Sequence, residues 1–463
     1  MVIADRLRFI DTRSHQLLTT RQRLSSVAVR LKKFQSTIFQ RFFRTETVGG
    51  SVLLLFGIAA LVLANSPLAE RYEHLWSIPI TVGIAHHSLS LTLHQWINDG
   101  LMGVFFLLVG LEIKRELLVG ELASAKKAVF PIACAIGRML VPAGIYLMCN
   151  TSGFGARGWG IPVATDIAFA LGALALLSPD APIGARVFLT ALAIVDDMGA
   201  VLVIAIFYSQ SIMWSSLAGA AAVVFVLIGF NVARVRQLWP YLFAGIVLWY
   251  FMHQSGVHAT ISGVILACTI PTNTRINAAQ FSREAHALVN QFDRAETGDF
   301  LVLSSERQQE ALFALKRASE DVAAPTLKLE TALHNFSAFV VMPLFAFANA
   351  GVKIGLSTEH AEIALGVLAG LVIGKPLGIM AAAFLGVKSG IAKLPASVGW
   401  APLLGYASLA GIGFTMSLFI AMLAFDGTAA VDAAKQGILG GSLLGGVAGA
   451  IILKAARHSR DDE

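Results

Sequence analysis

Long apolar runs separated by short polar stretches occupy most of this chain. The runs are about 17 to 25 residues long, and an α-helix of that length crosses a bilayer core of about 30 Å. The pattern therefore predicts an all-α polytopic membrane protein with twelve transmembrane helices. The predicted spans are 48–66, 97–118, 128–149, 159–177, 186–208, 214–230, 239–253, 256–271, 336–354, 361–385, 400–425 and 430–454.

In the connection between the first two spans, apolar and polar residues follow a different pattern. Residues 78–94, IPITVGIAHHSLSLTLH, alternate apolar and polar side chains around a turn-like HHS. Alternation with a period of two is typical of a strand with one exposed face. A short β-hairpin is therefore expected here, on the periplasmic side, opposite to the chain termini.

Composition agrees with a chain that is embedded in a membrane. Of the 463 residues, 56% are hydrophobic and only 14% are charged, and the mean hydropathy is +0.71. One or two soluble domains of this length would carry more charge. The three cysteines lie far apart in apolar runs, which argues against a disulfide framework and against a Cys-x-x-Cys metal site.

The distribution of basic residues predicts the orientation. Twelve spans place both termini on one side, and the cytoplasmic side of a membrane protein is enriched in Lys and Arg. All but six of the 35 basic residues lie on the side of the termini, so both termini are expected in the cytoplasm. The six exceptions are Arg71, Arg157, Lys353 and Lys435 in the opposite loops and Arg138 and Lys375 within spans. The net charge of +6 then reflects topology, and no nucleic-acid partner is needed to explain it.

The segments outside the membrane complete the domain organisation. Residues 1–47 are rich in Lys and Arg and carry apolar residues at helical spacing, which predicts a basic amphipathic helix on the cytoplasmic surface of the lipid bilayer. The expected order is this tail, spans one to eight in 48–271, a long cytoplasmic loop at 272–334, spans nine to twelve in 335–455, and a cytoplasmic C-terminus at 456–463. Part of the loop, ERQQEALFALKRASE, has a helical pattern.

Charged side chains stand near the middle of three predicted spans. Asp196 and Asp197 are adjacent in ALAIVDDMGA, Thr165 and Asp166 are adjacent in GIPVATDIAFALG, and Lys375 lies in LVIGKPLGI. A charge at the centre of a bilayer costs several kcal/mol, so such residues are usually functional. Three carboxylates and one ammonium group form a constellation suited to a small cation.

The expected chemistry is competition between ions. A carboxylate removed from water binds protons more tightly, and a neighbouring acid couples the two titrations. Sodium prefers hard oxygen ligands, so protons and sodium compete for the same atoms. A purely structural salt bridge between Lys375 and Asp196 is the alternative, but it leaves Asp166 and Asp197 without a balancing cation.

Two predicted spans are interrupted in their backbone. The span at 159–177 holds Gly160 and Pro162, and the span at 400–425 reads YASLAGIGFTMSLFI. Each is the middle member of a triplet, spans three to five and spans ten to twelve, and the two triplets have opposite orientations. Inverted repeats with broken helices at the midplane are typical of secondary transporters. Asp166 would balance the partial positive charge at the N-terminal ends of the half-helices there. Lys375 would balance the partial negative charge at their C-terminal ends.

Seven segments carry a resemblance to a known family. In order, they are FFLLVGLEIKREL, PVATDIAFALG, LAIVDDMGA, SGVHATISGVI, MPLFAFANAGV, LVIGKPLGI and GIGFTMSLFIA. Together they make the chain similar to the NhaA family of sodium/proton antiporters from about residue 48 to 454. The tail and much of the long loop are not covered.

The resemblance implies a set of roles and a reaction. Asp166 and Asp197 correspond to the carboxylates that bind the ion and the proton, Thr165 to a hydroxyl that lines the site, and Asp196 and Lys375 to a pair that is salt-bridged in one state. Members exchange external H+ for internal Na+ or Li+ electrogenically, for sodium and pH homeostasis. They reside in the bacterial inner membrane without a cofactor, and dimerisation through 78–94 is expected.

A second cluster is implied at the cytoplasmic side. Glu112, Arg115 and Glu116 match residues associated in the family with pH sensing and a cytoplasmic funnel, and Glu330 and His334 match part of the same region. Thr331 and Asn335 stand where the family pattern has a histidine and a proline, so the pH response is expected to differ. Solvated charges at a helix end are the simpler interpretation of this cluster.

Arg138 departs from the family pattern, which has a small residue in the third span. Three explanations are open: the side chain reaches the interface, it pairs with an acid, or the span boundary is shifted. Two other functions are compatible with buried acids in a membrane protein. A sodium-coupled symporter of a related fold is the closer one, and an intramembrane aspartyl protease is disfavoured because the chain has no Gly-x-Gly-Asp motif. The protein is therefore expected to be a transporter and not an enzyme.

Overall fold

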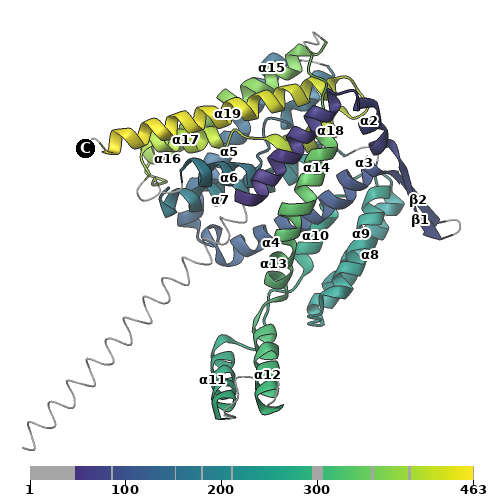
Figure 1. Cartoon of the computed structure of the whole chain (residues 1–463), viewed down its shortest axis with the longest axis vertical. Coiled ribbons are helices and arrows are strands. Elements are labelled where there is room, and N and C mark those ends of the chain that lie inside the picture. The colour runs from purple at the N-terminus through teal and green to yellow at the C-terminus, as the bar shows by residue number, and fades with distance from the viewer. Residues whose placement is uncertain are drawn as a thin grey trace, which may run out of the picture.

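The structure is a computed structural model that describes residues 47–84, 87–151, 153–178, 181–209, 212–294, 306–355, 359–394 and 398–461. The amphipathic helix expected at 1–47 lies outside these ranges except for its last residue. Within them, the regular secondary structure is helical apart from a single two-stranded sheet. Most helices pack into one bundle, from which the sheet and a helix pair project in different directions (Figure 1).

Eight helices in the described ranges are long and apolar enough to cross a membrane. They are Thr47–Ala64, Leu93–Val119, Ala128–Cys149, Gly184–Phe207, Trp214–Val232, Pro325–Asn349, Ala361–Lys388 and Ala430–Arg457. The pair of α17 (Trp400–Leu409) and α18 (Phe414–Phe425) is bent by 49° at its break and passes the same test of length and hydropathy when taken together, which gives nine if the pair is one span. The chain is thus a multi-pass integral membrane protein.

Three other predicted spans contain shorter helices. They correspond to α6 (Ile167–Leu177), α9 (Leu238–Gln254) and α10 (Ile261–Thr269). The α10 helix has only nine residues because the preceding segment, 255–260, forms turns instead of a helix. The break expected in the span at 159–177 is present: the short 3-10 helix η3 (Gly155–Gly160) ends there, and α6 begins only at Ile167.

The remaining helices include both apolar segments and the polar helices α2, α11 and α12. They are α2 (Ala69–Ser77), α3 (Leu93–Gln95), η1 (Trp96–Leu101), α4 (Met102–Val119), η2 (Glu121–Ala123), α5 (Ala125–Cys149), α7 (Ile183–Phe207), α8 (Trp214–Val232), α11 (Ala278–Arg294), α12 (Glu306–Val322), α13 (Pro325–Phe336), η5 (Ser337–Val341), α14 (Met342–Asn349), α15 (Ala361–Ala369), η6 (Gly370–Gly374), α16 (Lys375–Lys388) and α19 (Ala430–Asp461).

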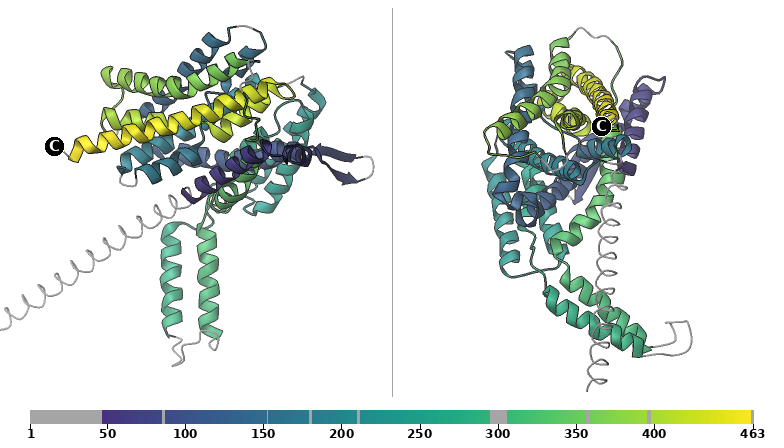
Figure 2. Two further views of the ribbon diagram at one scale, coloured as in Figure 1. Left: turned by 45° about the horizontal axis from the view of Figure 1, so that its top comes forward. Right: turned by 90° about the vertical axis from the view of Figure 1, so that its left-hand side faces the viewer.

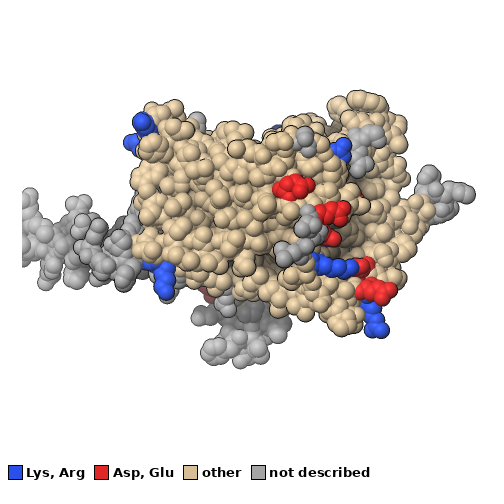
Figure 3. Space-filling view, turned by 90° about the horizontal axis from the view of Figure 1, so that it is seen from above, with Lys and Arg blue, Asp and Glu red and all other residues tan. Residues whose placement is uncertain are grey.

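The outer surface of the bundle fits a lipid environment. Large apolar side chains stand exposed on several helices, for example Leu55, Val62 and Ile246, each at least 60% accessible. On the face seen in Figure 3, Lys, Arg, Asp and Glu are absent from most of the centre and gather mainly toward one end. A soluble protein rarely exposes such extended apolar surface, whereas contact with acyl chains requires it.

The expected β-hairpin is confirmed. Strands β1 (Pro79–Ile84) and β2 (His87–Thr92) are antiparallel, and their register runs from Pro79 opposite Thr92 to Ile84 opposite His87. Because β2 begins at His87, this histidine belongs to the strand and not to the turn expected at HHS. The chain then enters α3 through a capping box between Thr92 and Gln95, so the hairpin is joined directly to the second span.

The long loop forms a helix pair. Helices α11 and α12 lie side by side and stand away from the bundle in two directions of view (Figures 1 and 2). The pattern predicted α12 but not α11. An ion pair between Arg275 and Asp321, at 3.3 Å, closes the base of the pair. The next helix begins at Pro325 and continues through α13, η5 and α14, so Glu330 and His334 belong to a membrane-capable helix.

Candidate functional site

The two broken helices cross at the centre of the bundle. Residues 161–166 after η3 and residues 410–413 between α17 and α18 are not helical, so their backbone groups need partners from outside their own helices. Each break supplies partners for the other. Asp166 N donates to Ile412 O at 3.0 Å, Thr165 Oγ1 to Ala410 O at 3.1 Å, and Ser417 Oγ to Ile161 O at 2.8 Å.

Asp166 lies between the N-terminal ends of two half-helices. It is the N-cap of α6, and its Oδ1 accepts from Phe169 N at 3.0 Å. Its Oδ2 accepts from Thr415 N at 3.2 Å and from Thr415 Oγ1 at 2.5 Å, at the start of α18. Both ends carry partial positive charge, and a carboxylate between them offsets that charge as expected.

Asp197 lines a cavity next to Asp166. The side chain comes from α7 and is 2% exposed. The cavity, of about 70 Å³, is also lined by Thr165 and Asp166. Among the described residues, no hydrogen bond or ion pair engages the Asp197 carboxylate. The structure therefore brings three of the predicted site residues around one small space, with a buried carboxylate facing it.

The same cavity reaches the predicted cytoplasmic cluster. Glu112 on α4 and His334 on α13 line its other end, and their side chains are 3.9 Å apart. Beside them, Arg115 Nη1 contacts Glu330 Oε1 at 2.5 Å. Glu116 lies one turn further along α4, where its carboxylate folds over Gly120. Two of the five predicted residues, Glu112 and His334, thus line the cavity, and the Arg115–Glu330 ion pair and Glu116 are not part of its lining.

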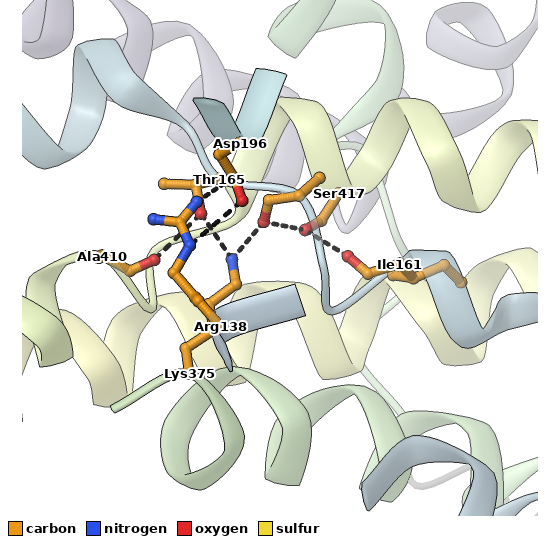
Figure 4. Close-up of polar contacts among 8 residues, drawn as sticks. Arg138, Ile161, Thr165, Asp196, Lys375, Ala410 and Ser417 are labelled. Carbon is orange, nitrogen blue, oxygen red and sulfur yellow. Dashed lines mark hydrogen bonds and ion pairs between the residues drawn. The ribbon is translucent and has the colours of Figure 1, made fainter. Parts of the chain in front are cut away.

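Asp196 pairs with Arg138, and not with Lys375 as expected. Arg138 Nε donates to Asp196 Oδ1 at 3.2 Å, and the guanidinium Nη2 contacts Oδ2. Both side chains are 1% exposed. Figure 4 shows the guanidinium group aimed at the carboxylate. Of the three explanations open for Arg138, pairing with an acid is the one that the structure confirms.

Lys375 has different partners. It is the first residue of α16 and is fully buried. Its Nζ donates to Thr165 Oγ1 at 2.8 Å and to Ala164 O, both in the break before α6. In the portion of the chain that the structure describes, no ion pair joins Lys375 to a carboxylate. The lysine therefore satisfies backbone and hydroxyl oxygens of the broken helix, as expected for a cation at the negative end of a half-helix.

A close helix crossing brings Arg138 and Lys375 to the same place. Gly137 on α5 and Gly378 on α16 face each other so closely that a Cβ on Gly378 would lie 2.7 Å from the carbonyl carbon of Gly137. Such small residues let membrane helices approach with their backbones in contact. Arg138 directly follows one glycine, and Lys375 lies one turn before the other. The sequence offered a signal for Arg138, its charge within an apolar span, but no signal for this crossing.

The chain is similar to known transporters along most of its length. Residues 40–453 match the family described as Na+/H+ antiporter 1. The chain is 46% identical over 428 residues to the Na(+)/H(+) antiporter NhaA of Oleidesulfovibrio alaskensis, covering 92% of this chain and 95% of that one. It is 45% identical over 411 residues to NhaA of Wolinella succinogenes (88% and 91% covered) and 44% identical over 432 residues to NhaA of Helicobacter pylori (92% and 98% covered).

These similarities extend over nearly the full length of the relatives and include both broken helices. They lend no support to the symporter or to the protease that the sequence left open. The chain belongs to the Na+/H+ antiporter 1 family and is, like its members, a membrane transporter that exchanges sodium ions for protons.

Proposed function

We propose that this antiporter moves cytoplasmic Na+ or Li+ outward in exchange for external H+, electrogenically and by alternating access, for sodium and pH homeostasis. Asp166 and Asp197 bind the cation or the protons, and Thr165 supplies a further oxygen. Asp196 and Lys375 hold the surrounding helices. The working environment is the inner membrane of a bacterium.

The observation that carries this proposal is the Asp197 carboxylate, which is buried, faces a cavity and has no hydrogen-bond or ion-pair partner among the described residues. An isolated charge in such a place is costly, so it is stabilised by whichever positive species occupies the cavity. Asp166 and Thr165 supply oxygens from the opposite wall. Because protons and cations neutralise the same carboxylates, binding of one releases the other.

The topology that we propose has twelve spans with both termini in the cytoplasm. The bent α17–α18 pair and the interrupted segment before α6 support two inverted repeats, at spans three to five and ten to twelve. The short helices α6, α9 and α10 are then completed as spans by the non-helical segments beside them. The excess of Lys and Arg on one side supports the orientation. In this arrangement the long loop with α11 and α12 is cytoplasmic, and the basic tail at 1–47 contacts lipid.

The cluster of Glu112, Arg115, Glu330 and His334 is proposed to control access and the pH response. Glu112 and His334 line the cavity and lie 3.9 Å apart, and Arg115 and Glu330 form an ion pair on the same two helices. Glu116, one turn away, contributes negative charge to the approach. A histidine at such a position is suited to a response near neutral pH.

Glu330→Gln is expected to raise the apparent KM for Na+ about 3-fold to 10-fold. The substitution leaves the Arg115 guanidinium without its carboxylate near the cavity, so the local potential becomes less favourable to cations. The KM is measured from sodium-dependent proton movement in vesicles. Glu310→Gln, the same charge change on the exposed surface of α12, is the matched control. An equal effect of both variants would contradict a role for this cluster.

A homodimer is also proposed. A two-stranded hairpin is marginally stable alone, and the β1–β2 sheet has open edges on which a second copy could add strands. The molecular mass of the detergent-solubilised protein, with and without residues 79–92, tests this arrangement. A monomer at all concentrations would contradict it.

The decisive experiment uses inverted membrane vesicles from cells that lack their own antiporters. A proton gradient quenches a pH-sensitive dye, and Na+, Li+ or K+ is then added. Recovery of fluorescence is expected with Na+ and Li+ but not with K+. If an imposed membrane potential changes the rate, the exchange is electrogenic. Equal recovery with K+, or none with Na+, would contradict the proposal.

A further inference from the structure

An apolar groove of about 420 Å³ runs along the outside of the bundle, between the first span, α6 and α19. Each of the three helices contributes a single face, because the lining positions follow helical spacing along 47–54, 169–177 and 439–450. The face of α19 alone extends over about 16 Å. The groove is therefore elongated, and its length is about half the thickness of a bilayer core.

The rim of the groove belongs to the lipid-facing surface of the protein. Leu54, Leu176 and Leu443 line it and are between 43% and 68% exposed. Small residues leave the space between these side chains. At Gly446, for example, an added Cβ would still be 3.6 Å from its nearest neighbour, Ile412 Cδ1. The groove is thus continuous with the outer surface that the acyl chains of the bilayer cover.

The inner end of the groove is closed by the broken helix. Phe414, the first residue of α18, lines it together with Ile412 from the break. The Phe414 ring lies against the first span, where a Cβ on Gly57 would be 2.6 Å from its Cζ, and its centroid is 5.8 Å from that of Phe169 in an edge-on contact. A molecule in the groove would therefore touch the same break that binds Asp166.

The groove offers little to a polar ligand. Ser442 Oγ accepts from Gly413 N and Phe414 N, both at 3.2 Å, and Ser51 Oγ donates to Thr47 O at 2.9 Å. Both serine hydroxyls are thus engaged within the protein, and the other lining side chains are apolar except for that of Thr47 at one end. Apolar cavities do not hold ordered water, so this space suits a hydrocarbon chain.

Basic residues follow at the end of the groove that is remote from the break. Lys454 and Arg457 continue the groove-lining face of α19 by one and two turns beyond Ala450. Arg457 Nη2 donates to Ser178 Oγ at 2.9 Å, so the guanidinium lies at the C-terminal end of α6, and Lys454 is exposed. A phosphate group at this end would meet positive charge while its hydrocarbon chain extends toward Phe414.

We propose that the groove is a binding site for one acyl chain of a phospholipid, whose phosphate group lies near Lys454 and Arg457 and whose chain completes the packing of the broken helix at Phe414. The length of the groove, its apolar lining and its basic end each match this ligand. A ligand that binds only the folded state stabilises that state, so the lipid stabilises the protein. The inference does not depend on which ions the protein exchanges.

A photoactivatable lipid tests the site directly. The full-length protein is reconstituted with phosphatidylglycerol that carries a diazirine near the middle of one acyl chain, the sample is irradiated, and the labelled residues are identified by mass spectrometry. Labelling within 169–177 and 439–450 is expected to exceed that of α8, another lipid-facing helix, by about 3-fold or more. Gly446→Leu fills the groove from α19 and should lower this labelling about 3-fold.

The matched control is Gly229→Leu, the same substitution at an exposed glycine of α8 that has no neighbour within 4 Å of an added Cβ. A second measurement is the thermal midpoint of the delipidated protein in detergent. Phosphatidylglycerol should raise this midpoint by about 5 °C in the unmodified protein and in the control, and by less than half as much in Gly446→Leu. Ala173→Leu, on the α6 wall, should behave like Gly446→Leu.

Two outcomes would overturn the inference. One is labelling of 439–450 no stronger than that of α8, as when the groove is empty or is covered by residues 1–46. The other is a folded Gly446→Leu or Ala173→Leu variant whose labelling and lipid response equal those of the control. If neither variant folds, the labelling of the unmodified protein decides alone. An unmodified protein that binds the lipid but shows no sodium-dependent proton movement would contradict the proposed function and leave this site in place.

Discussion

Asp197→Asn is expected to abolish sodium-dependent proton movement, with a loss of at least about 100-fold. The carboxylate is buried beside the cavity, and no side chain in the described ranges neutralises it, so its charge is available to the transported ion. The asparagine amide has nearly the same shape as the carboxylate, but it carries no charge and does not take up or release a proton near neutral pH. The initial rate of dye recovery after addition of Na+ measures the effect.

The matched control for this substitution is Asp432→Asn. Asp432 is an exposed carboxylate in the first turn of α19, and its replacement should leave the rate unchanged. Both variants should purify in the same amount, because removing an unpaired buried charge does not destabilise the fold. Full exchange in Asp197→Asn would show that the carboxylate is not the ion-binding group.

Asp166 is expected to give two different results according to its replacement. Asp166→Asn keeps a side-chain oxygen that can cap α6, because asparagine is as good an N-cap as aspartate, so the protein should fold but lose exchange about 100-fold. Asp166→Ala removes acceptors from both α6 and α18 and should also lower the free energy of unfolding by about 1 to 3 kcal/mol.

The comparison of the two variants separates charge from structure. Exchange is followed in vesicles, and stability by the thermal midpoint in detergent, with the unmodified protein as reference. An Asn variant that is as unstable as the Ala variant would mean that the charge itself holds the two half-helices together. An Asn variant with normal exchange would remove Asp166 from the binding site.

The membrane character and the acidic residues of the site could be predicted from the sequence, because each depends on local information. A long apolar run is enough to predict a span, and an aspartate within such a run stands out by its cost. The hairpin at 79–92 could also be predicted, because apolar and polar residues alternate there and do not alternate in the neighbouring apolar runs.

The partners of the buried charges could not be predicted, because they depend on contacts between distant helices. The sequence contained Arg138, but its pairing with Asp196, 58 residues along the chain, requires the contact of α5 with α7, where Met139 packs against Gly199. The resemblance pointed to Lys375 instead, since the family pattern has a small residue at the position of Arg138. The length of α10 could not be predicted for a similar reason. The apolar run predicts a span from residue 256, but residues 256–260 form turns and the helix begins only at Ile261.

The shared cap at Asp166 has a mechanical consequence. One carboxylate accepts hydrogen bonds from the N-terminal ends of α6 and α18, two segments separated by about half of the chain, so both helices are affected by the same electric charge. If a proton or Na+ binds Asp166 as we propose, it neutralises that charge, and the attraction at both helix ends weakens at the same instant. Binding at this one carboxylate would then act on the two half-helices together, without a relay of side chains between them.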